Sequence, residues 1–134
     1  MIIEENRAKP AELVNLYAAT SAAFTILKQE FQVPDTYELA LRDVDAAEQC
    51  LTSTVDIAAI TLRKVQALRW VAKPGVETTN DIVVALAADL LRALDHLAQY
   101  CSDQTSVDSL TRFKHQVVVA ARLAAGDGSI SRLR

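Results

Sequence analysis

Apolar side chains recur at helical spacing in the first part of the chain. From Pro10 onward, one stripe alternates between spacings of four and three residues: Leu13, Tyr17, Thr20, Phe24, Leu27 and Phe31. This period is typical of an amphipathic helix with one face turned to a core. Pro10 suits the first turn of a helix, and the Val33-Pro34 pair ends it because the residue before proline avoids the helical region. The pattern therefore predicts a helix from Pro10 to this pair.

The longest stripe lies between Asp35 and Lys73. Asp35 and Glu38 resemble a capping box, and the Lys-Pro-Gly sequence that begins at Lys73 is a stop signal. Between these signals the stripe continues as Val44, Ala47, Leu51, Val55, Ala58, Leu62, Val65 and Leu68. The Thr-Ser-Thr sequence at 52–54 contains weaker helix formers, so a bend or break there stays open.

A third helix is predicted after the polar sequence Thr78–Asp81, which offers several N-caps. Its stripe comprises Val83, Leu86, Leu90, Leu91, Ala93, Leu94, Leu97 and Tyr100. We expect Leu86, Leu90 and Leu97 to belong to the core.

The fourth predicted helix starts with Thr105 and Asp108, which repeat the capping pattern, and ends before Gly126. Its inner face comprises Leu110, Phe113, Val117, Ala120 and Ala124. The four patterns together predict an all-α fold, an antiparallel helical bundle of about four long helices. We expect a single domain over residues 1–134, with a flexible lead-in at 1–9 and a short basic tail at 129–134.

Composition supports this class and excludes others. The 134 residues are 51% hydrophobic but only 5% aromatic, with three glycines and three prolines. Sheet folds need many more turns than these residues would mark, and the core must be largely aliphatic and alanine. The net charge of −3 argues against a general nucleic-acid binder. No basic and apolar leader occupies Met1–Lys9 and no apolar run could span a bilayer, so we expect a cytoplasmic protein.

Motifs for metal or cofactor chemistry are missing from the sequence. Cys50 and Cys101 stand singly, without Cys-x-x-Cys spacing, and are interpreted as reduced, half-buried thiols. No Glu-x-x-His pattern, glycine-rich phosphate loop or nucleophile elbow occurs. We expect no metal and no cofactor, and the sequence favours a protein without enzymatic activity.

Charges form blocks along the chain. The start of the predicted second helix and the third helix are acidic, whereas the end of the second and the fourth are basic. Acids near helix starts and bases near helix ends complement the helix dipole. Antiparallel neighbours with opposite charges can also pair along their edges. The blocks therefore predict ion pairs between neighbouring helices rather than a dedicated anion site.

His115 suggests an alternative function that would involve specific chemistry. Helical spacing places it opposite the apolar stripe of its helix, with Arg112 one turn before it and Arg122 two turns after. An exposed histidine in mid-helix with nearby arginines resembles the arrangement in histidine phosphotransfer domains, which are helical bundles of similar size. Those domains usually carry lysine and glycine shortly after the histidine, and Val119 stands in that region here. His96 is expected at the edge of its stripe.

Surplus apolar surface points to the preferred function. A second stripe lies beside the first in the later half of the long predicted helix, and the single tryptophan stands next to it. These candidate interface residues are Ile57, Ile60, Ala67, Trp70 and Val71. The pattern favours a non-enzymatic interaction or oligomerisation module of the adaptor type, as a homodimer or with a protein partner. Small-molecule binding between alanine-lined helices stays open as a third possibility.

Overall fold

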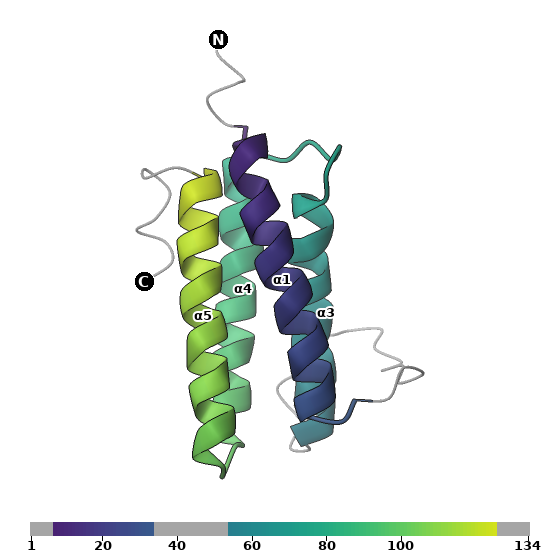
Figure 1. Ribbon diagram of the computed structural model, residues 1–134, viewed down its shortest axis with the longest axis vertical. Helices are drawn as coiled ribbons and strands as arrows, with labels where there is room; N and C mark the ends of the chain where they lie inside the picture. The colour runs from purple at the N-terminus through teal and green to yellow at the C-terminus, as the bar shows by residue number, and fades with distance from the viewer. Residues whose placement is uncertain (1–6, 34–53, 126–134) are drawn as a thin grey trace.

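The chain folds as an antiparallel four-helix bundle in the part that the computed structural model describes, residues 7–33 and 54–125 (Figure 1). The helices are α1 (Pro10–Glu30), α3 (Thr54–Ala72), α4 (Asn80–Gln99) and α5 (Gln104–Ala125). The predicted all-α class is confirmed. The predicted cap at Asp35, the possible break at 52–53, Cys50, most of the lead-in and the basic tail lie outside the described residues.

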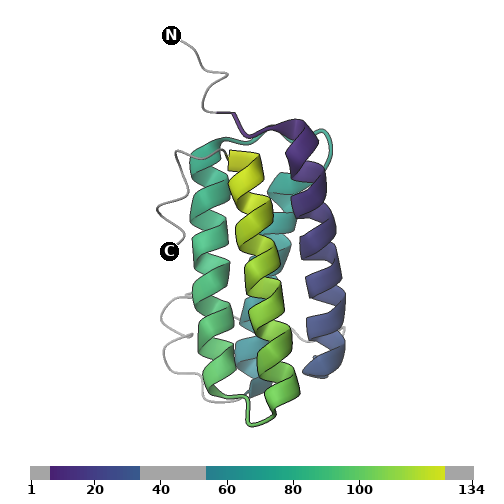
Figure 2. The ribbon, with the colours of Figure 1, turned by 60° about the vertical axis from the view of Figure 1, so that its left-hand side comes forward.

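Each helix packs against two antiparallel neighbours. α1 contacts α3 and α5, and α4 contacts the same two helices, so α1 and α4 are diagonally opposite. Figures 1 and 2 show the chain running up and down the bundle in successive helices. At one end, the Lys9 N–H donates to the Ala124 carbonyl at 2.9 Å, and the Ala8 N–H donates to the Thr78 carbonyl at 3.1 Å. These bonds join the start of α1 to the end of α5 and to the segment before α4.

Most helix ends follow the predicted signals. Pro10 begins α1, and the helix ends at Glu30, with Gln32 in the left-handed region at φ 52° shortly before Pro34. Thr79 caps α4, because its hydroxyl accepts a hydrogen bond from the Ile82 N–H at 3.4 Å.

The predicted N-cap of the last helix was wrong by two residues. Asp103 immediately precedes α5, and its Oδ1 accepts a hydrogen bond from the Thr105 N–H at 3.2 Å. Thr105 therefore lies inside the helix instead of capping it. Asp108 accepts from the Gln104 side chain at 2.9 Å, so the expected pair of Thr105 with Asp108 does not form the cap.

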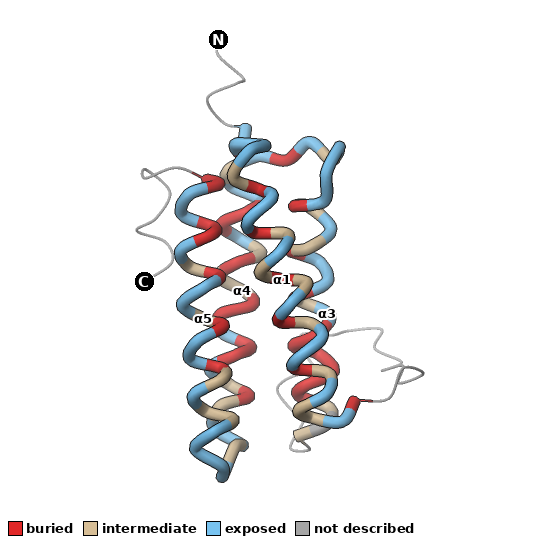
Figure 3. Tube along the Cα trace, viewed as in Figure 1, coloured by how far each residue is buried: buried red, intermediate tan, exposed pale blue. Residues whose placement is uncertain are grey.

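The core consists mainly of aliphatic and alanine side chains. Figure 3 marks the buried positions along the helices. Among the described residues, Phe113 is the only buried aromatic side chain. The α5 stripe is buried as predicted, from Leu110 to Ala124. Two buried hydroxyls are satisfied within their own helices: Thr20 donates to the Leu16 carbonyl at 2.9 Å, and Thr61 donates to the Ile57 carbonyl at 2.8 Å.

The predicted inner face of α1 requires a correction. Tyr17, Phe24 and Phe31 are only half-buried, whereas Leu16 and Ala23 are buried. The face is rotated because smaller side chains at the centre let α1 approach its neighbours closely, and the aromatic rings then lie at the edge.

On α4 the prediction was right for Leu90 and Leu97, each 0% exposed, and wrong for Leu86, which is half-buried at the edge of the core. Tyr100, also placed in the predicted stripe, is 40% exposed just past the helix end. Val84 and Ala87 are buried in addition to the other predicted stripe residues, so the inner face of α4 is wider than the predicted stripe.

Ion pairs join α4 to both of its neighbours, as the charge blocks predicted. The Lys64 ammonium on α3 lies 2.9 Å from Asp89 on α4, and the Lys114 ammonium on α5 lies 2.8 Å from Asp95. Arg92 also contacts Asp89 at 2.8 Å. The acidic edges of α4 are therefore matched by cations from both adjacent helices.

Replacing Leu90 or Leu97 with alanine should lower the free energy of unfolding by ~2–5 kcal/mol, because each replacement opens a cavity in a closely packed core. Urea denaturation followed by circular dichroism measures this loss. Leu123→Ala is the matched control, since Leu123 is 49% exposed on α5 and its replacement should cost little. Equal losses for Leu90→Ala and Leu123→Ala would show that the inner face of α4 is assigned incorrectly.

Candidate interaction surface

The structure separates the predicted interface residues into two groups. Ile57 and Ile60 are 2% and 1% exposed, whereas Ala67 and Trp70 are exposed and Val71 is half-buried. Every residue from Ile57 to Leu62 is buried, so this part of α3 is enclosed on all sides. A helix segment that is apolar all round is buried within its own chain. The expectation that the second stripe leaves Ile57 and Ile60 free for a second copy is therefore not met.

The later half of α3 presents a polar and aromatic outer face. Arg63, Gln66, Ala67, Trp70 and Lys73 are all exposed. Trp70 is 62% exposed, the largest exposed fraction among the large hydrophobic side chains described. Of the predicted interface residues, Ala67 and Trp70 remain accessible here, and they belong to this face.

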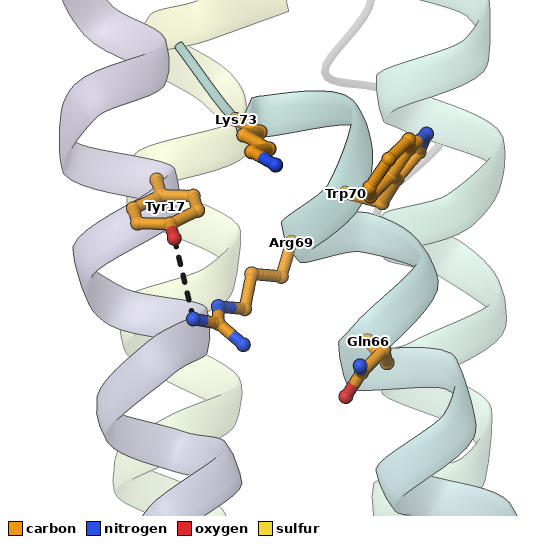
Figure 4. A pocket seen from close by; sticks show the side chains of 5 residues that line it. All are labelled: Tyr17, Gln66, Arg69, Trp70 and Lys73. Carbon is orange, nitrogen blue, oxygen red and sulfur yellow. Dashed lines mark hydrogen bonds between the residues drawn. The ribbon is translucent and has the colours of Figure 1, made fainter.

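A pocket of about 190 Å³ lies between this face and α1. It is lined by Tyr17 on α1, by Gln66, Arg69 and Trp70 on α3, and by Lys73 directly after α3 (Figure 4). We call it the α1–α3 pocket. The α3 residues reach it together because positions three, four and seven apart share one side of a helix.

Arg69 connects the two helices that form the pocket. Its Nε donates to the Ser21 hydroxyl at 2.9 Å, and its Nη2 donates to the Tyr17 hydroxyl at 3.2 Å. The guanidinium carbon also lies 5.1 Å from the centre of the Tyr17 ring. Tyr17 and Ser21 are four residues apart and thus present both hydroxyls on the same side of α1. The half-buried position of Tyr17 thus places its ring and its hydroxyl beside Arg69.

Lys73 makes the second contact between a cation and a ring. Its ammonium lies 5.0 Å from the centre of the Trp70 ring, within the range of a cation–π interaction. The pocket therefore combines two cations with two aromatic rings.

No carboxylate is among the described residues that line the α1–α3 pocket. This differs from the α4 edges, where Lys64 and Lys114 each contact an aspartate. The hydrogen-bond partners of Arg69 are neutral hydroxyls, and no acid among the described residues forms an ion pair with it. The pocket consequently carries a local charge of about +2 within a chain of net charge −3.

Sequence reasoning missed this pocket for identifiable reasons. Tyr17 was placed in the core stripe, and Arg69 and Lys73 were interpreted as cations complementing the end of a helix. The available signal was the Arg-Trp pair at 69–70, followed one turn later by Lys73. What was not visible in the sequence is that α1 supplies Tyr17 and Ser21 opposite these residues.

His115 is exposed on α5, as its spacing predicted, and Arg112 and Arg122 are exposed too. Val119, 41% exposed, shares the outer part of this helix. α5 packs mainly against α1 and α4, so the structure does not bring His115 to the α1–α3 pocket. His96 is half-buried and lies edge-to-face with Tyr100 at 5.4 Å, which agrees with its expected place at the margin of the core.

Over residues 7–33 and 54–125, no three side chains of the kinds that bind metals come together. In the same ranges, no helix combines the length and apolarity needed to cross a membrane.

Comparisons with protein-family models, with curated proteins and with solved structures found no match.

Cys101, at the end of α4, should react slowly with alkylating agents near neutral pH. Partial burial raises the pKa of its thiol, and the nearby carboxylates of Glu30 and Asp103 raise it further. The thiolate is the form that reacts with iodoacetamide. The rate of modification of Cys101 should therefore rise at a higher pH than the rate measured for the thiol of glutathione. The Cys50→Ser variant leaves Cys101 as the only thiol to be measured. A rate profile at or below the pH range of glutathione would contradict the raised pKa.

Proposed function

We propose that this chain is a non-enzymatic helical interaction module that docks through the outer face of α3. The observation that carries the proposal is Trp70, which leaves 62% of its surface exposed beside Arg69 and Lys73. Tryptophan and arginine are the residues most enriched among those that dominate binding energy at protein interfaces. The proposed partner is a second copy of the chain or another protein, and not a nucleic acid.

The arrangement around Trp70 favours docking over an incidental exposed ring. A tryptophan can bury ~150–250 Å² on contact with a partner, and that burial stabilises a complex through the hydrophobic effect. Lys73 and the fixed guanidinium of Arg69 supply polar contacts at the margin of the same surface. A hydrophobic anchor surrounded by polar groups is the usual plan of a protein interface.

The proposed setting is the cytoplasm. Cys101 is a free, half-buried thiol, which agrees with a reducing compartment. The predicted homo-oligomer is retained in this proposal, but its basis moves from Ile57 and Ile60 to the exposed residues Ala67 and Trp70.

The Trp70→Ala variant should lose the assembly or partner that the wild-type chain forms. Sedimentation at micromolar concentration measures self-association, and affinity capture from the native cell with quantitative mass spectrometry measures partners. Leu123→Ala is the matched control, because it removes a similarly exposed apolar side chain from α5. Loss with Trp70→Ala and retention with Leu123→Ala would support the proposal. A monomer whose captured proteins are unchanged by Trp70→Ala would overturn it.

A second candidate function is phosphotransfer through His115, favoured by its exposure and by the exposed Arg112 one turn away. Arginine could steady phosphoryl oxygens through charge-assisted hydrogen bonds. The interaction-module proposal predicts instead that phosphorylated receiver domains from the same organism transfer no phosphate to the chain. It also predicts that His115→Gln leaves folding and assembly unchanged. Acid-labile, base-stable phosphate on the wild type and not on His115→Gln would establish the second function in place of the first.

A further inference from the structure

We infer that the α1–α3 pocket binds a carboxylate of an acidic peptide segment on a partner protein. This inference rests on the proposed interaction function and assigns the chemistry that the partner presents to α3. The pocket is formed by Tyr17, Gln66, Arg69, Trp70 and Lys73.

The charge of the pocket is complementary to that of a carboxylate. Arg69 and Lys73 both line the pocket, and no carboxylate is found among its described lining residues. Two cations held near each other repel, and an anion between them removes that repulsion. Elsewhere in the described bundle, Lys64 and Lys114 are matched by aspartates of α4. In the α1–α3 pocket, no described lining residue supplies a matching acid, and the carboxylate of a partner would take that place.

The pocket also supplies hydrogen-bond donors for a carboxylate. A guanidinium has five N–H groups, and two of those on Arg69 donate to the hydroxyls of Ser21 and Tyr17. These two bonds hold the guanidinium in place and leave further N–H groups for a ligand. The Lys73 ammonium has three N–H groups, and the Tyr17 hydroxyl can still donate its own hydrogen. A carboxylate accepts such bonds strongly because it is charged.

The size of the pocket also limits what it can hold. At about 190 Å³, the pocket is smaller than the ~300–1,000 Å³ typical of sites for drug-sized molecules. It suits one acidic side chain with part of its backbone. The exposed Trp70 ring at its margin provides an apolar surface for a neighbouring residue of the same peptide. The expected motif is therefore an aspartate or glutamate next to an apolar residue.

A peptide fits these features better than a nucleic acid does. Nucleic-acid binding draws on many phosphate contacts along an extended basic surface. Here Arg69 and Lys73 belong to one small pocket, and the neighbouring helix α4 carries the acids Asp89 and Asp95. The overall charge of −3 would also repel a polyanion.

The test begins with a random peptide library displayed on phage and selected against the full-length wild-type chain. We expect the enriched peptides to carry an aspartate or glutamate beside an apolar residue. Binding of a tryptophan-free synthetic copy can then be followed by the fluorescence of Trp70, the single tryptophan of the chain. Replacing the acid of that peptide with its amide should weaken binding about tenfold or more, because a charge-assisted contact is lost.

Variants of the chain locate the contact. Lys73→Gln should weaken peptide binding about tenfold while leaving the circular dichroism spectrum unchanged, since Lys73 is exposed. Arg69→Gln should weaken it at least as much, although it also removes the bonds to α1. Arg63→Gln is the matched control, because Arg63 is exposed on the same helix but does not line the pocket. Its affinity should stay close to that of the wild type.

Three outcomes would overturn the inference. The first is a selection that enriches no peptides with acidic residues. The second is an equal loss of affinity in Arg63→Gln and Lys73→Gln, which would indicate only a general electrostatic field. The third is tighter binding of single-stranded oligonucleotide than of the selected peptide. Any one of these outcomes would contradict the carboxylate site. If partner binding or assembly still depended on Trp70, the proposed interaction function would nevertheless be supported.

Discussion

Close packing of aliphatic and alanine side chains along the bundle axis is the constraint on which the rest of this structure depends. Leu16 and Ala23 on α1 and Val84 and Ala87 on α4 are buried, and Phe113 is the only buried aromatic among the described residues. Four helices that approach through alanine and aliphatic side chains leave little room for rings near the axis. Large aromatic side chains are consequently displaced to the seams between helices or to the surface.

The α1–α3 seam shows the consequence of this displacement. Tyr17 lies half-buried at the edge of α1, where its ring and hydroxyl both contact Arg69. Trp70 lies farther out, with Lys73 against its ring. The aromatic groups that the core does not accommodate thus become the walls of the α1–α3 pocket. The pocket is therefore a product of the same packing that stabilises the bundle.

The distribution of charge follows from the order of the helices around the bundle. α4 contacts α3 on one side and α5 on the other, and its aspartates pair with a lysine from each. α1 presents hydroxyls, and not acids, to Arg69 on the other side of α3. One helix, α3, is therefore electrostatically matched along its α4 side and left basic along its α1 side. The asymmetry arises because α3 lies between aspartates of α4 on one side and hydroxyls of α1 on the other.

The sequence by itself determined the class of fold and most helix ends. Its apolar periodicity predicted the all-α bundle. Pro10 and Thr79 lie at helix starts, as their residue types indicate. The apolar stripe of α5 is buried, as its helical spacing predicted. These features are local, because spacing along one helix and the chemistry of a cap depend on residues close in sequence.

Only the tertiary structure decided which residues become the surface. The burial of Ile57 and Ile60, the rotation of the α1 face that moves Tyr17 to the seam, and the pairing of Arg69 with Ser21 all depend on a neighbouring helix. A helical stripe indicates that one face of a helix is apolar. It does not indicate which neighbouring helix covers that face or how the helix is rotated about its axis. Residues 48 and 52 positions apart meet across the α1–α3 seam, and no local pattern encodes that contact. The candidate site exists only because folding brings those two segments together.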